Sequence, residues 1–332
     1  TRGPVTIEAR ATRPAGANLP TPHVVTATRE MLAMIGGRAP HDLVIALITG
    51  GGSALLAAPR QGVSLEEKIS LTRRLSESGA DIASLNAARR SLSTVKGGGF
   101  ARSCSAGRLL VLVLSDVVGD DLEVIASGPC MPGVPTVPSG YWTTPSGCVV
   151  QHVIVGSNAT AVDAAAQAAR DLGYLVHVRH AAAGTQTESA ADDVGVRLAL
   201  DAIALDAETR RDGRPRAIVE GGESTVALPA DHGTGGRNQQ TVVATIEAVL
   251  RHGRWPAGVL VASVGTDGED GPTEAAGGLA DAAVAAVAAG LDVARARARR
   301  DAQPLLAAAG GLVVTGPTGT NVCDVRMVLC RP

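Results

Sequence analysis

The segment LVIALITGGGSALL, from Leu43 to Leu56, indicates the fold class of this chain. Its apolar run up to Ile48 has the composition of a buried strand, and three glycines with Ser53 follow before an Ala/Leu-rich segment that can open a helix. Glycines permit a sharp turn that brings backbone N–H groups close to an anion, and a helix N-terminus adds partial positive charge. We therefore expect a strand, an anion-binding glycine turn and a helix. A tight turn without ligand is the alternative.

The same alternation of strands and helices recurs along the rest of the chain. Further strands are expected at 5–9, 109–114, 152–155, 174–178, 217–219, 258–264 and 312–314, and helices at 23–35, 64–78, 80–93, 159–172, 189–210, 240–251 and 280–289. This order predicts an α/β protein with two α/β/α domains and largely parallel sheets, whose ligands bind at the carboxyl ends of the strands. The polar segment 212–215 is the expected linker, which gives domains at 1–212 and 213–332.

Composition disfavours several classes of protein. The chain has 332 residues, of which 45% are hydrophobic and 19% charged, as in soluble two-domain proteins. A net charge of −2 with scattered basic residues disfavours nucleic-acid binding, and no apolar run of membrane-spanning length or signal peptide is seen. Five cysteines without a CxxC pair indicate neither disulfides nor zinc, as expected for a cytoplasmic protein. The expected partner is a small-molecule substrate, and a homodimer stays open.

Two cations beside glycine loops point to phosphate chemistry. Phosphoryl transfer depends on positioning and charge neutralisation, which small donors, backbone N–H groups and a few charges supply. Lys96 precedes Gly97 and Gly98, so its ammonium and the loop N–H groups could bind phosphate oxygens together. Arg237 lies between a glycine turn and a helix, where a guanidinium would bind a carboxylate or phosphate bidentately. The alternatives are a solvated lysine and a surface arginine, and no Walker A motif is present.

Acidic residues follow two of the expected strands. Asp116 comes directly after strand 109–114, with Asp120 and Asp121 shortly behind it. Oxygen ligands of this kind suit Mg²⁺, although Asp116 could instead accept the proton of an attacking hydroxyl or cap a helix. Asp267 in the segment GTDGEDG belongs to a turn or to an acidic metal loop, and the spacing there does not match an EF-hand.

Seven blocks of sequence carry a family resemblance. In order they are GGGSALL, SGADIASLNAARRSLSTVKGGGFA, LVLSDVVGDDLEVIASGP, GGESTV, GTGGRNQQ, VGTDGEDGPTEAAG and TGPTGTNVCDV. The chain resembles the bacterial glycerate 2-kinases of the MOFRL type from about residue 40 to residue 330. The resemblance implies an N-terminal α/β/α domain, a C-terminal MOFRL domain and an active site in the cleft between them. It also implies phosphorylation of D-glycerate to 2-phosphoglycerate with ATP and Mg²⁺.

Residue chemistry and resemblance together give a set of expected site residues. Asp116, Arg237 and Lys96 are the expected catalytic residues, and Asp116 with Asp120 would hold the metal. Residues expected to bind the nucleotide or the substrate are Gly50, Gly51, Gly52, Ser53, Gly97, Gly98, Glu223, Asn238, Asp267, Thr318 and Asn321.

Several departures from the family blocks leave an alternative function open. Family members usually begin with a further βα unit that bears a lysine, and this sequence starts at Thr1 without a counterpart. The segment from Ser127 to Gly133 differs from the usual SGPTVPD, and Gln240 replaces a glutamate. The alternative is a catalytically impaired homologue that binds a nucleotide or a hydroxy acid. An NAD-dependent hydroxypyruvate reductase is disfavoured because the first strand is not followed by GxGxxG.

Overall fold

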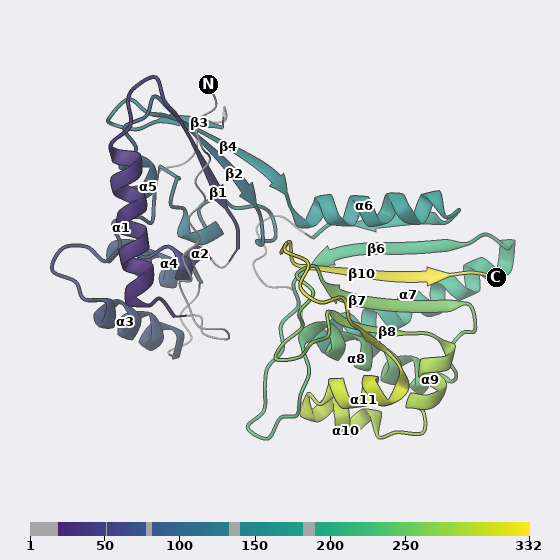
Figure 1. Cartoon of the computed structure of the whole chain (residues 1–332). Helices are drawn as coiled ribbons and strands as arrows, with labels where there is room; N and C mark the ends of the chain where they lie inside the picture. The colour runs from purple at the N-terminus through teal and green to yellow at the C-terminus, as the bar shows by residue number, and fades with distance from the viewer. Residues whose placement is uncertain (1–18, 51, 78–81, 133–139, 182–189) are drawn as a thin grey trace. The chain divides into compact units, whose positions relative to one another are not determined.

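The computed structural model describes residues 19–50, 52–77, 82–132, 140–181 and 190–332 (Figure 1). The expected strand at 5–9 and Gly51 lie outside these ranges. The chain forms two compact units. Unit 1 comprises residues 1–114 and 121–155, and unit 2 comprises residues 115–120 and 156–332. Among the described helices, none is both long and apolar enough to cross a membrane.

Unit 1 is built on a four-stranded sheet with the order β1-β2-β4-β3. Its strands are β1 (Leu43–Ile48), β2 (Arg108–Leu114), β3 (Tyr141–Thr143) and β4 (Val149–Gly156), and its helices are α1 (Pro22–Gly36), α2 (Gly52–Leu55), α3 (Leu65–Glu77), α4 (Ile82–Ser91), α5 (Gly99–Arg102) and the 3₁₀ turn η1 (Ile125–Ser127). Strands β1 and β2 pair in parallel, and β3 pairs antiparallel with β4. Strand β1 followed by α2 confirms the expected strand, turn and helix.

Local signals in unit 1 define the start of α3. The Ser64 hydroxyl accepts the Glu67 N–H at 3.0 Å, and the Glu67 carboxylate accepts the Ser64 N–H at 2.7 Å. This reciprocal pair is a capping box, which satisfies donors that the first turn of a helix leaves free.

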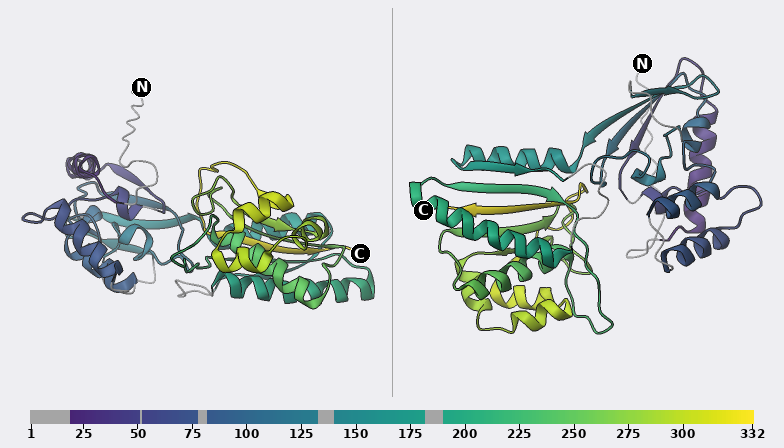
Figure 2. Two further views of the ribbon diagram at one scale, coloured as in Figure 1. Left: turned by 90° about the horizontal axis from the view of Figure 1, so that it is seen from below. Right: turned by 180° about the vertical axis from the view of Figure 1, so that it is seen from behind.

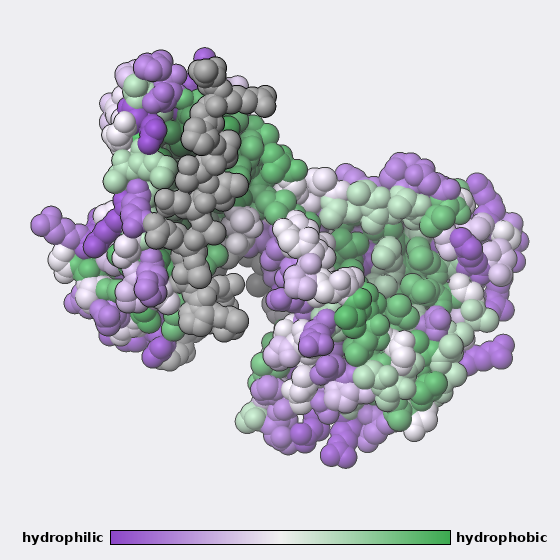
Figure 3. All heavy atoms as spheres, in the orientation of Figure 1, coloured by the Kyte–Doolittle hydropathy of each residue, from purple (hydrophilic) through white to green (hydrophobic). Residues whose placement is uncertain are grey.

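One face of the unit 1 sheet is exposed. Ala46 of β1 and its cross-strand partner Val111 are buried on one face, whereas Leu43, Ile45 and Leu47 of β1 alternate onto the other. The Leu47 side chain is 75% exposed. Figure 3 shows hydrophobic residues gathered over the strands of this unit. Within the described ranges, the apolar side chains on this face of β1 are therefore not covered by a helical layer.

Unit 2 is built on a six-stranded sheet with the order β5-β6-β10-β7-β8-β9. The strands are β5 (Leu175–Arg179), β6 (Arg216–Gly222), β7 (Val259–Gly265), β8 (Gly277–Ala280), β9 (Leu312–Val313) and β10 (Asp324–Cys330). Strands β5 and β6 are parallel, but β10 runs antiparallel to both β6 and β7, and β8 antiparallel to both β7 and β9. The expectation of a largely parallel sheet is therefore corrected for β8 and β10. No helix separates either strand from the one before it in the chain, so each returns antiparallel.

Helices cover both faces of the unit 2 sheet (Figure 2). They are α6 (Asn158–Asp171), α7 (Ala191–Asp212), α8 (Arg237–His252), α9 (Ala282–Ala288), α10 (Val293–Arg299) and α11 (Ala302–Ala309). Val219 of β6 packs with Val162 of α6 on one face, while its neighbour Ile218 packs with α7 and α8 on the other. Adjacent strand residues point to opposite faces, so the short apolar strand predicted at 217–219 contributes to two cores.

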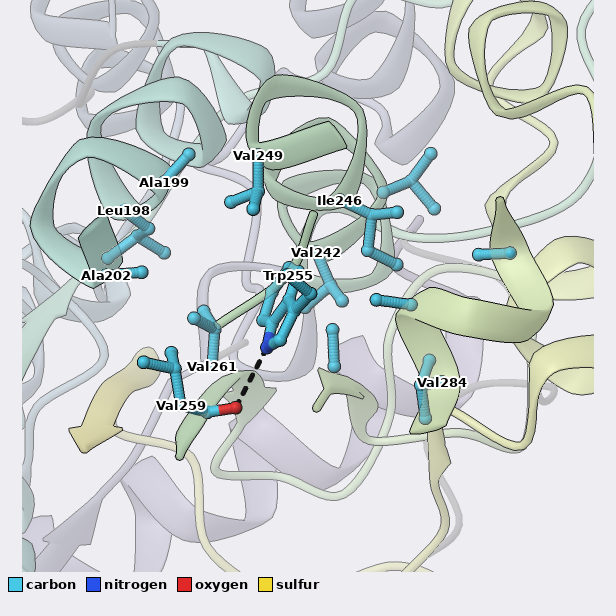
Figure 4. Packing of buried hydrophobic residues seen from close by; sticks show 14 of the residues in the cluster. Leu198, Ala199, Ala202, Val242, Ile246, Val249, Trp255, Val259, Val261 and Val284 are labelled. Carbon is cyan, nitrogen blue, oxygen red and sulfur yellow. Dashed lines mark hydrogen bonds between the residues drawn. The ribbon is translucent and has the colours of Figure 1, made fainter. Parts of the chain in front are cut away.

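The larger core lies between the sheet and helices α7 and α8 (Figure 4). Trp255 is buried there, and its indole N–H donates to the Val259 carbonyl at 2.9 Å. Gly195 of α7 lies so close to α8 that an added Cβ would crowd the Thr241 carbonyl. Small residues such as Ala199 and Ala202 continue this contact, which explains why a chain with few aromatic residues can fill its core.

The compact units divide the chain at a different place from the predicted linker. Helix α7 does end at Asp212, where Gly213 adopts a left-handed conformation. However, the strands before and after it, β5 and β6, pair within one sheet. The structural boundary therefore lies at the junction of β4 and α6, near residue 156.

Candidate active site

Arg237, the first residue of α8, carries two carboxylate contacts. Its Nε lies 2.9 Å and 3.1 Å from the two oxygens of Asp324, its Nη2 lies 3.0 Å from Asp324 Oδ1, and its Nη1 lies 2.8 Å from Glu223 Oε1. The predicted bidentate carboxylate is thus a side chain of the protein itself. Burial opposes a charge on Arg237, but the two carboxylates outweigh it and raise its pKa. The guanidinium is therefore a fixed positive charge.

Asp324 anchors this arrangement from the first position of β10. Its carboxylate is fully buried and also accepts the Asn238 side-chain N–H at 3.0 Å, while the Asn238 oxygen accepts the Ser263 hydroxyl at 2.6 Å. The Asn158 amide donates to the Asp324 carbonyl at 2.9 Å. Sequence analysis did not identify Asp324 as a site residue. The available signal was a single aspartate within the otherwise apolar run VCDV.

Asp270 positions the start of α8. Its carboxylate accepts the backbone N–H groups of Asn238 at 3.0 Å and Gln239 at 2.8 Å, which the first turn of a helix leaves without partners. A Cβ on Gly236 would overlap the Asp270 carboxylate. Gly236 therefore permits this close approach. In this structure Asp270 caps helix α8. An acidic metal loop was the role considered for its segment, GTDGEDG.

Asp116 belongs to unit 2 with Arg237, although it lies far earlier in the sequence. Its carbonyl oxygen accepts the Cys323 thiol at 3.0 Å, directly beside Asp324 in the chain. Burial raises the pKa of Glu223, Arg237 opposes the rise, and the charges of Asp324 and Asp116 add to it. The charge of Asp116 thus acts on Glu223, whose carboxylate contacts Arg237. A shared catalytic role of Asp116 and Arg237 stays a prediction.

Fewer contacts support the prediction that Asp120 helps to hold a metal ion. Asp120 adopts a left-handed conformation, and its N–H donates to the Val117 carbonyl at 3.0 Å. In the part of the chain that is described, no three His, Cys, Asp or Glu side chains gather as a metal site. Mg²⁺ needs only one or two carboxylates, so the oxygen donors near Arg237 fit this ion chemically. A magnesium ion shared by Asp116 and Asp120 stays a prediction.

A cavity of about 660 Å³ opens beside Arg237. It is lined by Glu223, Ser224, Thr225, Val226, Leu228, Gly235, Gly236, Arg237, Gln240, Asp267, Glu269, Asp270, Gly271, Pro272 and Arg300. Its volume lies in the range of small-molecule and cofactor pockets. The site therefore combines a fixed cation, helix N-terminus and space for a ligand.

Thr318 and Asn321 shape the loop that precedes β10. The Thr318 hydroxyl donates to the Thr266 carbonyl at 2.6 Å, and its N–H donates to the Asp267 carbonyl at 3.1 Å. The Asn321 side chain accepts the Cys323 N–H at 3.1 Å. These bonds hold the loop against the turn that contains Asp267, so the described contacts of these three predicted residues are structural. Their predicted contact with a ligand stays a prediction.

Lys96 lies in unit 1 and is buried, with 3% of its surface exposed. Its ammonium donates to the Ala126 carbonyl at 3.2 Å. Burial, together with the charges of Lys68 and Arg89, lowers the pKa of Lys96 to about 7. The alternative of a solvated lysine is therefore wrong.

The glycines after Lys96 have a packing role. The N–H groups of Gly97 and Gly98 donate to the carbonyls of Ser127 and Gly128, at 3.1 Å and 2.7 Å. A Cβ on Gly98 would overlap the Met131 carbonyl. The prediction that these N–H groups bind phosphate is thus wrong, because both already have partners within the protein.

The glycine turn after β1 is described in part. Gly50 is a turn residue, and Gly51 lies outside the described part. Gly52 and Ser53 open the short helix α2. A Cβ on Gly52 would crowd the Ala126 side chain, so α2 packs closely against η1. The side chain of Ser53 lies outside the described part, and anion binding by this turn stays a prediction.

Known families and proteins match both parts of the chain. Residues 4–142 match DUF4147, a domain of unknown function, and residues 216–324 match the MOFRL family. The chain is 37% identical to a glycerate kinase of Macaca fascicularis, covering 95% of this chain and 96% of that protein. It is 35% identical to the D-glycerate 2-kinase of Thermotoga maritima, covering 94% and 78%.

A solved structure agrees with these sequence matches. The crystal structure of a glycerate kinase from Thermotoga maritima superposes with a TM-score of 0.82 at 34% identity, covering 95% of this chain and 80% of that one. Both the sequence and the fold are therefore shared along nearly the whole chain. The protein belongs to the glycerate kinase family.

Proposed function

We propose that this protein is a glycerate 2-kinase that transfers the γ-phosphoryl group of ATP to the 2-hydroxyl of D-glycerate. Its similarity to a D-glycerate 2-kinase over 94% of its length supports the reaction. The observation that carries the proposal in the structure is Arg237, fixed by Asp324 and Glu223 at the wall of a large cavity. A rigid cation of this kind neutralises the charge of a transferring phosphoryl group.

Asp116 is the proposed base or metal ligand of this site. A carboxylate within hydrogen-bond reach of the substrate hydroxyl can accept its proton during attack. The oxygen donors of the site also suit Mg²⁺, which would be held by Asp116 and would neutralise phosphate charge when bound. Arg237 holds its position in either case, because Asp324 fixes its guanidinium from the buried side. Cytoplasmic location and a homodimer stay predictions.

One departure from the family blocks has a structural explanation. Gln240 donates its side-chain N–H to Asp192 at 2.7 Å and to the Arg297 carbonyl at 3.0 Å. A glutamate in this position would repel Asp192, so glutamine suits the neighbours that this chain provides. The change at Gln240 is therefore no argument for an impaired homologue.

The experiment that tests the proposal measures ADP formation from Mg·ATP with D-glycerate, L-glycerate or no acid. We expect turnover that depends on D-glycerate. Asp116→Asn should lower kcat by about 100-fold or more, as loss of a base or of a metal ligand does, while leaving the thermal melt unchanged. Asp193→Asn, at an exposed position of α7, is the matched control and should retain activity.

Two outcomes would contradict parts of this account. Wild-type turnover by Asp116→Asn would remove Asp116 from the chemistry. ATP binding without any ADP formation in the wild-type protein would identify the impaired homologue instead.

A further inference from the structure

Two cations of unit 1 lie on helices α3 and α4, which contact each other, and the charges of both act on a third cation, Lys96. Lys68 of α3 is 4% exposed, Lys96 is 3% exposed, and Arg89 of α4 is half-buried. The charges of Lys68 and Arg89 both lower the pKa of Lys96, and all three side chains are at least half-buried. The chain has only two lysines among its 30 basic residues, and both belong to this cluster. The preference for arginine elsewhere makes the two buried ammonium groups a distinct feature.

The cluster has few partners within the protein. The Lys68 ammonium is buried and has no hydrogen-bond partner among the described residues. Lys96 donates to the Ala126 carbonyl, and Arg89 makes one long contact of 3.4 Å to the Asn86 side-chain oxygen. Within the described ranges, no acidic side chain forms an ion pair with any of the three cations. Buried charges without counter-ions are costly, and native structures normally pair them.

We propose that Lys68, Arg89 and Lys96 form a binding site for a phosphoryl dianion. Ammonium groups and a guanidinium are the usual ligands of phosphate, and a bound dianion would supply the counter-charge that keeps both buried ammonium groups protonated. The inference rests on the proposed function, since a kinase handles such a group on its nucleotide and on its product. It adds Lys68 and Arg89, which carry no assigned role so far.

Calorimetry with three phosphorylated probes tests this site. The wild-type protein is titrated with inorganic phosphate, a non-hydrolysable ATP analogue and 2-phosphoglycerate, beside D-glycerate. Lys68→Met and Arg89→Met should each weaken the binding of the cognate phosphorylated probe by about tenfold or more, because each removes a charge-assisted contact. Arg74→Met, at an exposed position of the same helix α3, is the matched control and should leave the Kd unchanged.

A spectroscopic readout separates binding at the cluster from a change in folding. Because the chain has two lysines, side-chain labelled lysine gives two resonances, and Lys68→Met assigns them. The bound phosphorylated probe should shift both resonances in the wild-type protein and in Arg74→Met. The probe whose affinity falls in Lys68→Met identifies the source of the dianion, either the nucleotide or the phosphorylated product.

The possible results distinguish this site from the proposed reaction. Unchanged affinities in Lys68→Met and Arg89→Met, or unshifted lysine resonances, would overturn the site even if D-glycerate-dependent ADP formation is present. If Lys68→Met and Arg89→Met weaken only the binding of D-glycerate, the cluster binds a carboxylate, and the proposal is wrong. If the phosphorylated probe binds at the cluster but no ADP is formed, the proposed binding site stands and the proposed kinase activity is wrong.

Discussion

Asp324 is the residue on which the geometry of the candidate site depends most. It is fully buried, and it pairs with both Arg237 and Asn238. Replacing one partner of a buried ion pair leaves the other charge without compensation. The Arg237 guanidinium would then lose the contact that fixes its direction.

We expect Asp324→Asn to lower the free energy of unfolding by about 3 kcal/mol, the usual cost of breaking a buried pair. Urea denaturation measures this change. Asp231→Asn removes an exposed carboxylate that pairs with Arg299 and should cost less than about 1 kcal/mol. Equal effects of the two substitutions would contradict the role given to Asp324.

Because the folded protein lowers the pKa of Lys96, the free energy of unfolding depends on pH. The folded-state pKa of this lysine is lowered to about 7 from the ordinary value of 10.5, so between these values the unfolded chain binds more protons than the folded one. The free energy of unfolding should therefore rise with pH above about 7, by at most about 1.4 kcal/mol per pH unit for this group. Below pH 7 both states are protonated and the contribution becomes constant.

Urea denaturation at several pH values from 7 to 9.5 checks this dependence. Lys96→Met should reduce the rise, to which Lys68, whose pKa burial lowers to about 8, also contributes. Arg74→Met, which removes an exposed charge, should retain the full rise. An identical slope in the wild-type protein and in Lys96→Met would show that the folded protein does not lower the pKa of this lysine.

Helix α8 is the element that presents Arg237, and its first turn depends on a loop distant in sequence. Asp270 caps the helix, and Gly236 and Gly271 let the two segments approach. This arrangement makes the start of α8 sensitive to a single added methyl group.

Gly236→Ala should lower the free energy of unfolding by about 1–3 kcal/mol, because its Cβ would overlap the Asp270 carboxylate. It should also displace Arg237 and raise KM or lower kcat. Gly290→Ala, whose Cβ meets only the Val287 carbonyl in ordinary contact, is the control and should behave like the wild-type protein. Thermal melts and ADP assays of both variants provide the comparison.

The elements that sequence analysis predicted are those with continuous apolar runs or clear helical periodicity. Strand β1 and helix α3, with its Ser64 cap, are examples. Strand β10 was missed because Asp324 and Arg326 interrupt its apolar pattern, and both are fully buried in the structure. Arg326 lies 3.3 Å from Glu220, so tertiary ion pairs allow charges that a pattern of hydrophobicity excludes.

At the level of the whole molecule, the order of residues in the sequence does not correspond to the compact units. Residues 115–120 leave unit 1 and join unit 2, where the Ser115 N–H donates to the Gly156 carbonyl at 2.8 Å. Asp116 thereby joins Glu223 and Arg237, which the sequence motifs could only suggest. Lys96, predicted for the same chemistry, belongs to unit 1 together with Lys68 and Arg89, to which no role had been assigned from the sequence.

The identity of the reaction product tests the central claim most directly. The protein is incubated with Mg·ATP and D-glycerate, and the products are identified by phosphorus NMR. We expect ADP and 2-phosphoglycerate in equal amounts, and Asp116→Asn should form them at least about 100-fold more slowly. Exclusive formation of 3-phosphoglycerate, or ADP with free phosphate in the absence of any phosphorylated acid, would contradict this claim.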